Sequence, residues 1–375
     1  MQIDSLVIAG FRNFNSVEIS LASGANLLFG SNGSGKSNLL EAIYYLCTAK
    51  SFRGATDDVI KNRDSEFFRI AGEGYLEDRA VKIELAYKPR EKKHLKINDV
   101  PQPKLAALYE YLKVVFFGPD DVELILGSPA VRRRFLDISI AQLEPGYISL
   151  LWEYKKILAQ RNALLKELGN AYDSLGVIDD CSSLLVWDEK LIELGLDINR
   201  SRNKFIQTVS NLAKGYHEKL SGSNDELRIA YKASPTLDNY TPDAYRNKLD
   251  SKRTRELFMG QSMYGPHRDD LQFLLSNYDC KGFASRGQVK TAVLSAKLAV
   301  FEYTKQLCGE APILLLDEVY SDLDRKRLDY LMSLFPSLSQ VIVTTSKLGE
   351  VKELDIFGNI MRVDGGSIEK YMPQL

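Results

Sequence analysis

The sequence predicts an α/β protein in which both ends of the chain build a two-lobed body and the middle of the chain forms a short helical arm. Three observations predict this fold class. A glycine-rich segment at residues 30–37 stands between an apolar strand and an apolar helix. A second apolar run, at residues 313–316, ends in two adjacent acids about 280 residues further on. Between the two motifs, apolar side chains recur at helical spacing.

The first third of the chain predicts short strands around the glycine-rich segment. Apolar residues at alternate positions indicate strands, and the residues concerned are 3–9, 17–21, 26–29, 68–75, 81–87, 94–100 and 114–117. A helix is predicted from Lys36 to about Ala49. The stretch 94–100 contains an Asn98-Asp99 turn, which indicates antiparallel neighbours. We therefore expect a strand, loop and helix next to a set of antiparallel strands.

From about Asp120 to Arg255 the spacing of apolar residues becomes helical, as at Leu150, Tyr154 and Leu158. A short strand at residues 227–231 is expected to interrupt this block. No heptad pattern is sustained long enough to predict a long coiled coil. At about 1.5 Å per residue, helices of about 20 to 40 residues reach only about 30 to 60 Å. The middle block is therefore predicted to be a short arm.

Alternation of strands and helices resumes after the arm. The predicted elements are a strand at 271–275, a helix from 287 to about 308, strands at 313–316 and 340–345, a helix near 325–335, and a closing hairpin at 359–363 and 367–371. Four consecutive apolar residues at 313–316 are typical of a central parallel strand. The predicted segments are a first lobe at 1–119, a mainly helical arm at 120–256 and a returning segment at 257–375.

Composition excludes several classes of protein. The 49 basic and 50 acidic side chains nearly cancel, so nucleic-acid binding would need local patches. The cysteines lack a CxxC pair, which argues against a zinc knuckle or a disulfide framework; they are Cys47, Cys181, Cys280 and Cys308. No basic and apolar leader opens the chain, and no stretch approaches the roughly 20 apolar residues of a membrane span. We expect a cytoplasmic protein with reduced thiols and no membrane partner.

The glycine-rich segment matches the phosphate-loop pattern GxxxxGK[ST]. Its residues are Gly30, Ser31, Asn32, Gly33, Ser34, Gly35, Lys36 and Ser37. In this pattern, backbone N–H groups and the N-terminus of the next helix surround phosphate oxygens. Lys36 would reach the β and γ phosphates of ATP, and the Ser37 hydroxyl would bind Mg²⁺. The flanking strand and helix favour this interpretation over a glycine turn that binds nothing.

The apolar run at residues 313–316 ends in Asp317 and Glu318 and supplies the second half of the predicted site. Asp317 would hold Mg²⁺ through its water shell, and Glu318 would orient or deprotonate the attacking water. A strand that ends in Asp-Glu is common by itself, but the upstream phosphate loop favours the catalytic interpretation. Lys36 and Glu318 are thus the predicted catalytic residues, with ATP and Mg²⁺ as the bound groups.

The order of these motifs resembles that of the ABC-type ATPase heads of the SMC, Rad50 and RecF group, in which an insertion separates them. Ser321-Asp322-Leu323-Asp324 looks like a D-loop, and Ser285-Arg286-Gly287-Gln288 looks like a shortened ABC signature. The resemblance implies that Ser285 and Gly287 face a nucleotide held by a second subunit and adds Asp324 to the nucleotide-binding residues. By itself, Ser-Arg-Gly-Gln is more typical of an ordinary helix N-cap.

Three further stretches narrow the resemblance to the RecF family, over essentially the whole chain. They are Phe117-Gly118-Pro119-Asp120-Asp121, Arg132-Arg133-Arg134-Phe135-Leu136-Asp137 and Gly265-Pro266-His267-Arg268-Asp269-Asp270-Leu271. The resemblance implies a two-lobed ABC-type P-loop ATPase head that forms an ATP-dependent homodimer and hydrolyses ATP slowly. It also implies binding to single-stranded and gapped duplex DNA, and action with RecR, RecO and RecA in recombinational repair and the SOS response.

Two arginines and one departure complete the predicted site. Arg12 is expected near the adenine or the phosphates, unless it is a solvated turn arginine. Ser51-Phe52-Arg53, just beyond the helix that follows the phosphate loop, resembles the segment that carries a phosphate-contacting arginine in related heads. Where transport ATPases have a switch histidine, this chain has Thr344-Thr345-Ser346. Their hydroxyls can position a phosphate or a water but do not titrate near neutrality. No Q-loop glutamine is clear, which leaves Asp120 or Asp121 in that neighbourhood.

Local basic clusters are candidate DNA contacts, although each one is also typical of a solvated helix face. They are Arg132 to Arg134, Lys155-Lys156, Arg200, Arg202 and Lys204, and Lys252, Arg253 and Arg255.

Three other functions compete with this interpretation. An ABC-type ATPase subunit that drives a different protein partner, as in a transporter, is opposed by the separated motifs and the missing histidine. A coiled-coil tether is opposed by the short insert and the missing CxxC hook. A module that binds ATP without hydrolysing it is opposed by Glu318, and only a measured rate distinguishes that case.

Overall fold

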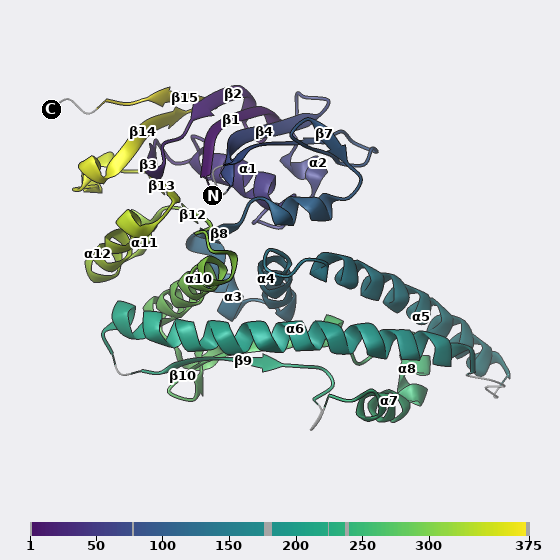
Figure 1. Cartoon of the computed structure of the whole chain (residues 1–375). Helices are drawn as coiled ribbons and strands as arrows, with labels where there is room; N and C mark the ends of the chain where they lie inside the picture. The colour runs from purple at the N-terminus through teal and green to yellow at the C-terminus, as the bar shows by residue number, and fades with distance from the viewer. Residues whose placement is uncertain (1, 77–78, 176–181, 224, 237–239, 373–375) are drawn as a thin grey trace. The chain divides into compact units, whose positions relative to one another are not determined.

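The computed structural model describes residues 2–76, 79–175, 182–223, 225–236 and 240–372 (Figure 1). The chain divides into two compact units. The first unit joins Met1–Val122, Leu212–Asn224 and Lys290–Leu375, and the second joins Glu123–Asn211 and Asp225–Val289. Both ends of the chain therefore contribute to one unit. The division into segments 1–119, 120–256 and 257–375 stays a prediction.

The first unit contains an antiparallel sheet. Its strands are β1 Gln2–Phe11, β2 Phe14–Ser20, β4 Phe68–Leu76, β5 Arg79–Tyr87, β6 His94–Ile97 and β7 Val100–Gln102, in the order β2-β1-β4-β5-β6-β7. Val81, Ile83 and Leu85 of β5 are buried while the residues between them are partly exposed, so one face of the strand packs on the core. Asn98 and Asp99 have φ of 50° and 63° in the predicted turn between β6 and β7.

The second sheet of the first unit is mixed and carries both motif strands. Its strands are β3 Gly24–Phe29, β8 Val114–Phe117, β12 Ile313–Leu316, β13 Gln340–Thr345, β14 Phe357–Asp364 and β15 Ser367–Lys370, in the order β15-β14-β3-β13-β12-β8. Every neighbouring pair except β14 and β15 is parallel. All four residues of β12 are buried, which confirms the predicted central strand. The carboxyl ends of β3 and β12 open at the same edge, with β13 between them.

Helix α1, Lys36–Thr48, packs against both sheets of the first unit, since it contacts β4 and β5 of one and β8 and β13 of the other. Apart from Ser37 and Asn38, all its residues are buried. A helix covered on all sides belongs to the core between two layers. The other helices are α2 Asp57–Ile60, α11 Val319–Asp322, α12 Arg325–Leu334 and α10 Arg286–Cys308, which begins in the second unit and continues in the first.

The second unit is mainly helical, as the sequence predicts. Its helices are α3 Glu123–Leu126, α4 Pro129–Ala141, α5 Tyr147–Leu175, α6 Ser182–Ser221, α7 Pro242–Asp250, α8 Arg253–Met259 and α9 Cys280–Phe283, of which α6 ends in the first unit. The small sheet β11-β10-β9 has strands β9 Leu227–Lys232, β10 Asp270–Leu275 and β11 Tyr278–Asp279. Helix α6 has 40 residues and is therefore about 60 Å long, the upper limit of the prediction.

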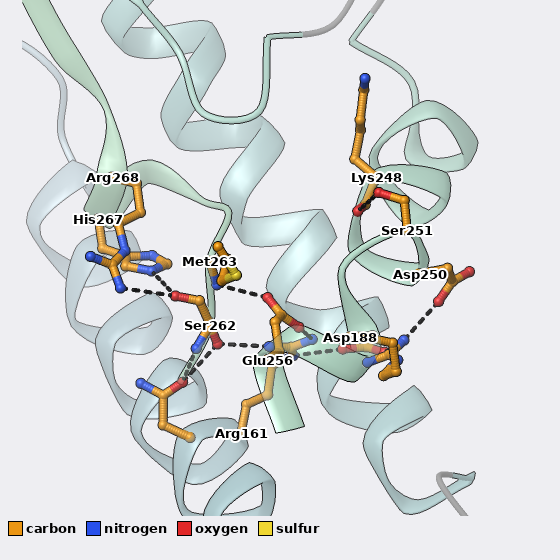
Figure 2. A network of polar contacts seen from close by, with 12 residues as sticks. Arg161, Asp188, Lys248, Asp250, Ser251, Glu256, Ser262, Met263, His267 and Arg268 are labelled. Atoms are coloured by element: carbon orange, nitrogen blue, oxygen red, sulfur yellow. Dashed lines mark hydrogen bonds and ion pairs between the residues drawn. The ribbon is translucent and has the colours of Figure 1, made fainter. Parts of the chain in front are cut away.

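A buried polar network connects the helices of the second unit (Figure 2). Arg161 of α5 is fully buried and donates to Asp188 at 2.6 Å, to Glu256 at 2.6 Å and to the Ser262 hydroxyl at 2.7 Å. Asp188 lies on α6 and Glu256 on α8, and Arg253 adds a second contact to Asp188 at 2.6 Å. A buried charge is costly unless it is paired and hydrogen-bonded. The network therefore fixes these three helices to one another.

Two arginines of the basic clusters are also internal to the second unit. Arg132 is 5% exposed and forms a two-point ion pair with Asp270, while Arg202 is 2% exposed and donates to Asp269 and Asp137. The expectation of a solvated helix face is wrong for both, because each guanidinium reaches acids on other segments of the same unit.

In the described part of the chain, no helix combines the length and the apolarity that crossing a membrane would require. Cys47, Cys280 and Cys308 are free thiols, and Cys181 lies outside the described residues. Burial raises the pKa of the Cys280 thiol to about 12, so this side chain stays protonated at neutral pH.

Candidate nucleotide-binding site

The loop at residues 30–37 connects β3 to α1, and two of its glycines are required by contacts within the chain. Gly35 has φ of 116°, and a Cβ there would lie 2.5 Å from the side-chain nitrogen of Asn13. A Cβ on Gly30 would lie 2.2 Å from the carbonyl oxygen of Val363. Asn13 also donates to the Ser34 carbonyl at 3.2 Å. The segment that follows β1 thus holds the loop in place.

Lys36 lies at the centre of this loop and is 4% exposed. Its Nζ donates to the carbonyl oxygens of Gly30 at 2.8 Å and Ser31 at 3.0 Å. The same atom lies 3.2 Å from Glu318 Oε1. The structure therefore brings the two predicted catalytic residues together. The loop tip, residues 31–33, is exposed.

Asp317 follows β12 and receives two hydroxyl donors on one oxygen. Ser37 Oγ lies 3.0 Å and Thr344 Oγ1 lies 2.6 Å from Asp317 Oδ1. Burial raises the pKa of the Asp317 carboxyl, and the two hydroxyl donors partly oppose that rise. In the described residues, no three His, Cys, Asp or Glu side chains gather as a metal cluster. Mg²⁺ here would depend on Ser37, Asp317, phosphate oxygens and water, and hard oxygen donors of this kind suit it.

Glu318 has a left-handed backbone, with φ of 52°, which is costly for a residue with a side chain. Its N–H donates to Thr344 Oγ1 at 2.9 Å. Its Oε2 accepts from the Ser346 N–H at 3.1 Å and from the Ser321 hydroxyl at 3.3 Å. One hydroxyl, that of Thr344, thus links Glu318 to Asp317. Threonine here takes part in positioning both acids.

Glu41, in the second turn of α1, is a site residue that sequence reasoning missed. It is fully buried and accepts from Arg12 at 2.8 and 2.9 Å, from Arg53 at 3.2 Å and from the Ser51 hydroxyl. The interpretation of Arg12 as a solvated turn arginine is therefore wrong, and its contact with a nucleotide stays a prediction. In the sequence, the signal for a buried polar contact here was a single acid, Glu41, within the apolar stretch 39–43.

The signature and D-loop residues lie at helix starts. Ser285 Oγ accepts from the Gln288 N–H at 3.2 Å, and Gln288 Oε1 accepts from the Ser285 N–H at 2.8 Å, which forms a reciprocal capping box. A Cβ built on Gly287 meets no atom within 4 Å. Asp324 caps α12 by accepting from the Arg327 N–H at 3.0 Å. Ser285 and Gly287 belong to the second unit, and their contact with a nucleotide stays a prediction, as does that of Asp324.

The turn after β8 holds Asp121, one of the two acids expected near a Q-loop. Asp121 accepts from the Gly118 N–H at 2.9 Å and pairs with Lys297 of α10 at 2.8 Å, whereas Asp120 is exposed. A Cβ on Gly118 would lie 3.2 Å from the Cβ of Asp317. This turn therefore lies directly against Asp317.

The mixed sheet, the phosphate loop and the acids at the end of β12 define an ABC-type P-loop ATPase head, and residues 2–369 match the family model described as RecF/RecN/SMC N terminal domain. The DNA replication and repair protein RecF of Lachnoclostridium phytofermentans is 36% identical over 371 residues, which cover 99% of this chain and 100% of that protein. RecF of Halalkalibacterium halodurans is 34% identical over 376 residues, with the same coverage. The chain belongs to the RecF family.

Solved structures agree with this assignment. One described as the recombination mediator protein RecF-ATP in the RecFOR pathway superposes with a TM-score of 0.90 at 30% identity, and covers 99% of this chain and 97% of that chain. An SMC head bound to the C-winged helix domain of ScpA gives 0.54 at 16% identity, and covers 99% and 97%. The second likeness shows a shared fold alone.

Proposed function

We propose that this chain is an ATP-hydrolysing DNA repair and replication protein that dimerises on ATP and binds single-stranded and gapped duplex DNA. One observation carries the proposal: the phosphate loop meets the end of β12, with Ser37 3.0 Å from Asp317 and Lys36 3.2 Å from Glu318. The relatives support the DNA function, since they are named DNA replication and repair proteins. The similar solved structure is described with ATP, which supports the nucleotide.

In the proposed mechanism, the residues of one protomer divide the chemistry of hydrolysis. Lys36 and the backbone N–H groups of the loop would bind the β and γ phosphates. Ser37 and Asp317 would hold Mg²⁺, which supplies positive charge against the phosphate oxygens when bound. Glu318 would orient the attacking water and accept its proton.

Two further observations, one on the phosphate loop and one at the end of β13, support this scheme. The buried Ser34 Oγ has no hydrogen-bond partner among the described residues, and a phosphate oxygen would satisfy it. Thr344 supports slow turnover, because its hydroxyl positions Asp317 and Glu318 but cannot titrate near neutrality as a histidine would.

A second copy of the chain would complete the site. The open space at Gly287 would let a phosphate approach the start of α10, where the helix dipole favours an anion. Ser285 would add a hydroxyl and Asp324 would lie at the dimer contact. Hydrolysis would then dissociate the dimer, so that the rate of ATP hydrolysis sets how long the protein stays on DNA.

In this scheme the ATP-bound dimer acts in the cytoplasm with RecR and RecO, and the three together place RecA on single-stranded DNA during recombinational repair and the SOS response. The RecFOR pathway, named for the similar solved structure, supports these partners.

The test is solution mass by light scattering, with and without Mg-ATP, repeated with gapped duplex DNA. We expect the mass to double with Mg-ATP and the dimer to stay on DNA. Glu318→Gln should stop turnover and stabilise the dimer, whereas Glu18→Gln, at an exposed position of β2, should change neither. A Glu318→Gln protein that stays monomeric in ATP and keeps normal turnover would contradict the shared site.

A second variant tests the signature residues. Ser285→Arg should prevent dimerisation in ATP, because the new side chain fills the expected approach to the phosphate. Ser23→Arg, at an exposed position of the first unit, adds the same bulk and charge as a control. Normal dimerisation of Ser285→Arg would remove the signature assignment.

A further inference from the structure

The connection between β5 and β6 gathers exposed basic side chains in a chain whose total charge is close to zero. From Lys88 to Lys96 the sequence is KPREKKHLK, with five Lys or Arg and one Glu. Arg90 and Lys92 are exposed, and neither is paired with an acid among the described residues. We name residues 88–93 the basic loop.

Both ends of the basic loop are fixed to the helices beneath it. Lys93 donates to the Ala49 carbonyl at 2.7 Å and pairs with Asp57 of α2 at 2.9 Å. Tyr87, the last residue of β5, donates to Asp58 at 2.7 Å. Ala49 is the C-cap of α1, the helix that follows the phosphate loop. The basic loop is therefore a supported surface, and a single helix connects it with the phosphate loop.

The acid within the basic loop neutralises only part of its charge. Glu91 is shared, since it lies 3.1 Å from Lys88 and 3.8 Å from His94. Asp57 and Asp58 are engaged by the two anchors described above. The charges of Arg90 and Lys92 are thus not neutralised by an acid of the basic loop, and both side chains are exposed to water, where a polyanion can reach them.

Three arginines of the basic clusters marked by the sequence differ from this loop, whereas Lys155, Lys156, Lys204 and Arg255 of the same clusters are exposed. Arg132 and Arg202 are buried in ion pairs, and Arg253 is held by Asp188 at 2.6 Å and by Asp250 at 2.7 Å. If these arginines bound phosphate instead, the ion pairs that stabilise the second unit would be lost. Arg90 and Lys92 of the basic loop can bind phosphate with no such loss.

We propose that the basic loop is a contact surface for the phosphate backbone of duplex DNA. The inference rests on the proposed function and names the surface that performs its DNA binding. Exposed Lys and Arg side chains neutralise phosphates and release counterions, whatever the base sequence. Because Lys93 fixes the loop to the end of α1, a duplex held here is connected through that helix to the nucleotide site.

The test is binding of the full-length protein to gapped duplex DNA with ATP, measured from about 50 to 200 mM NaCl. The variant is Arg90→Ala/Lys92→Ala. Its control is Lys352→Ala/Lys370→Ala, which removes the same charge at exposed positions of the first unit. Near 150 mM salt the first variant should bind about 10- to 30-fold more weakly, and the slope of log K against log salt should fall by about 2. The loss should be equal for duplexes of unrelated sequence.

The outcomes separate the two proposals. If the wild-type protein binds DNA and Arg90→Ala/Lys92→Ala keeps its affinity and salt slope, the surface is wrong and the proposed function stands. If the wild-type protein does not bind DNA with ATP even at low salt, the proposed function fails as well. Equal affinity for polyglutamate and DNA would assign the loop to acidic proteins and overturn the inference. Arg90→Gln/Lys92→Gln, with thermal unfolding of both variants, shows that a loss of binding comes from charge.

Discussion

Two buried aspartates, Asp317 and Asp269, show how the same side chain serves different purposes in the two units. They are 6% and 0% exposed, and burial raises the pKa of both carboxyls. Asp317 accepts from two neutral hydroxyl groups, those of Ser37 and Thr344. Asp269 accepts from the guanidinium of Arg202 at 2.6 Å and from the Ser234 N–H at 2.7 Å. The neutral partners of Asp317 fit the proposed Mg²⁺ site, and the buried charged partner of Asp269 indicates a structural role.

Asp269 lies in residues 265–271, one of the stretches that resemble the RecF family. In residues 265–271, Asp269 binds Arg202 of α6 and Asp270 binds Arg132 of α4. These contacts join β10 and the residue before it to two helices of the second unit. The acids of this stretch therefore hold that unit together, while the residues around Asp317 form the predicted nucleotide site.

Loss of Asp269 should have the largest effect on stability. Asp269→Ala leaves Arg202 buried without this acid, and we expect a loss of about 3–5 kcal/mol in the free energy of unfolding, measured with urea. Asp197→Ala, which breaks an exposed pair with Arg200, should cost less than about 0.5 kcal/mol. Asp269→Ala/Arg202→Met should recover part of the loss. Equal stability of Asp269→Ala and the wild type would remove the structural role.

Loss of Asp317 should act on turnover instead. We expect Asp317→Asn to lower kcat for ATP by about 100- to 1,000-fold, because the amide cannot help to neutralise a metal ion. The free energy of unfolding should stay the same or rise slightly, since burial disfavours the charged carboxylate in the folded state. Asp329→Asn, on an exposed face of α12, is the control. A destabilised Asp317→Asn protein with near-normal kcat would reverse the comparison.

Much of the fold is predictable because local sequence dictates it. The strand at 340–345 and the run at 313–316 have the bounds predicted from their apolar residues, and α1 begins at Lys36 as the phosphate-loop pattern requires. The contacts of Glu41 and Asp269 were not predictable in this way. Arg202 and Asp269 are 67 residues apart, and no periodicity reports which distant acid a buried arginine will meet.

The position of Thr344 is an intermediate case. The sequence indicated a hydroxyl near the phosphate, but only the structure shows this hydroxyl between Asp317 and Glu318. Thr344→Val should lower kcat about tenfold and cost about 1–3 kcal/mol of stability, because the Glu318 N–H loses its partner. Thr344→Ser should retain most of both. Similar losses in the two variants would mean that the methyl group, and not the hydroxyl, is needed.

Protonation of His267, two residues before Asp269 in the second unit, should have the smallest effect on stability. Burial lowers the pKa of this imidazole to about 4, and its ring nitrogens lie 2.7 Å from the Tyr154 hydroxyl and 3.2 Å from the Ser262 carbonyl. The unfolded chain, with a pKa near 6.5, binds the proton more tightly than the folded chain. Stability from this group is therefore present at neutral pH and falls as the pH drops from about 6.5 towards 4.

Between pH 6.5 and 5 this one group should cost about 1.5 kcal/mol in the free energy of unfolding. His267→Gln should flatten the pH dependence by that amount, because glutamine keeps a donor and an acceptor but cannot gain the proton. His94→Gln, at a side chain that is 65% exposed, is the control. Urea unfolding at several pH values measures both. If the free energy of unfolding of His267→Gln and of the wild type changed equally with pH, His267 would gain its proton in the folded protein as readily as in the unfolded chain. The side chain of His267 would then be more open to solvent than that of Asp269.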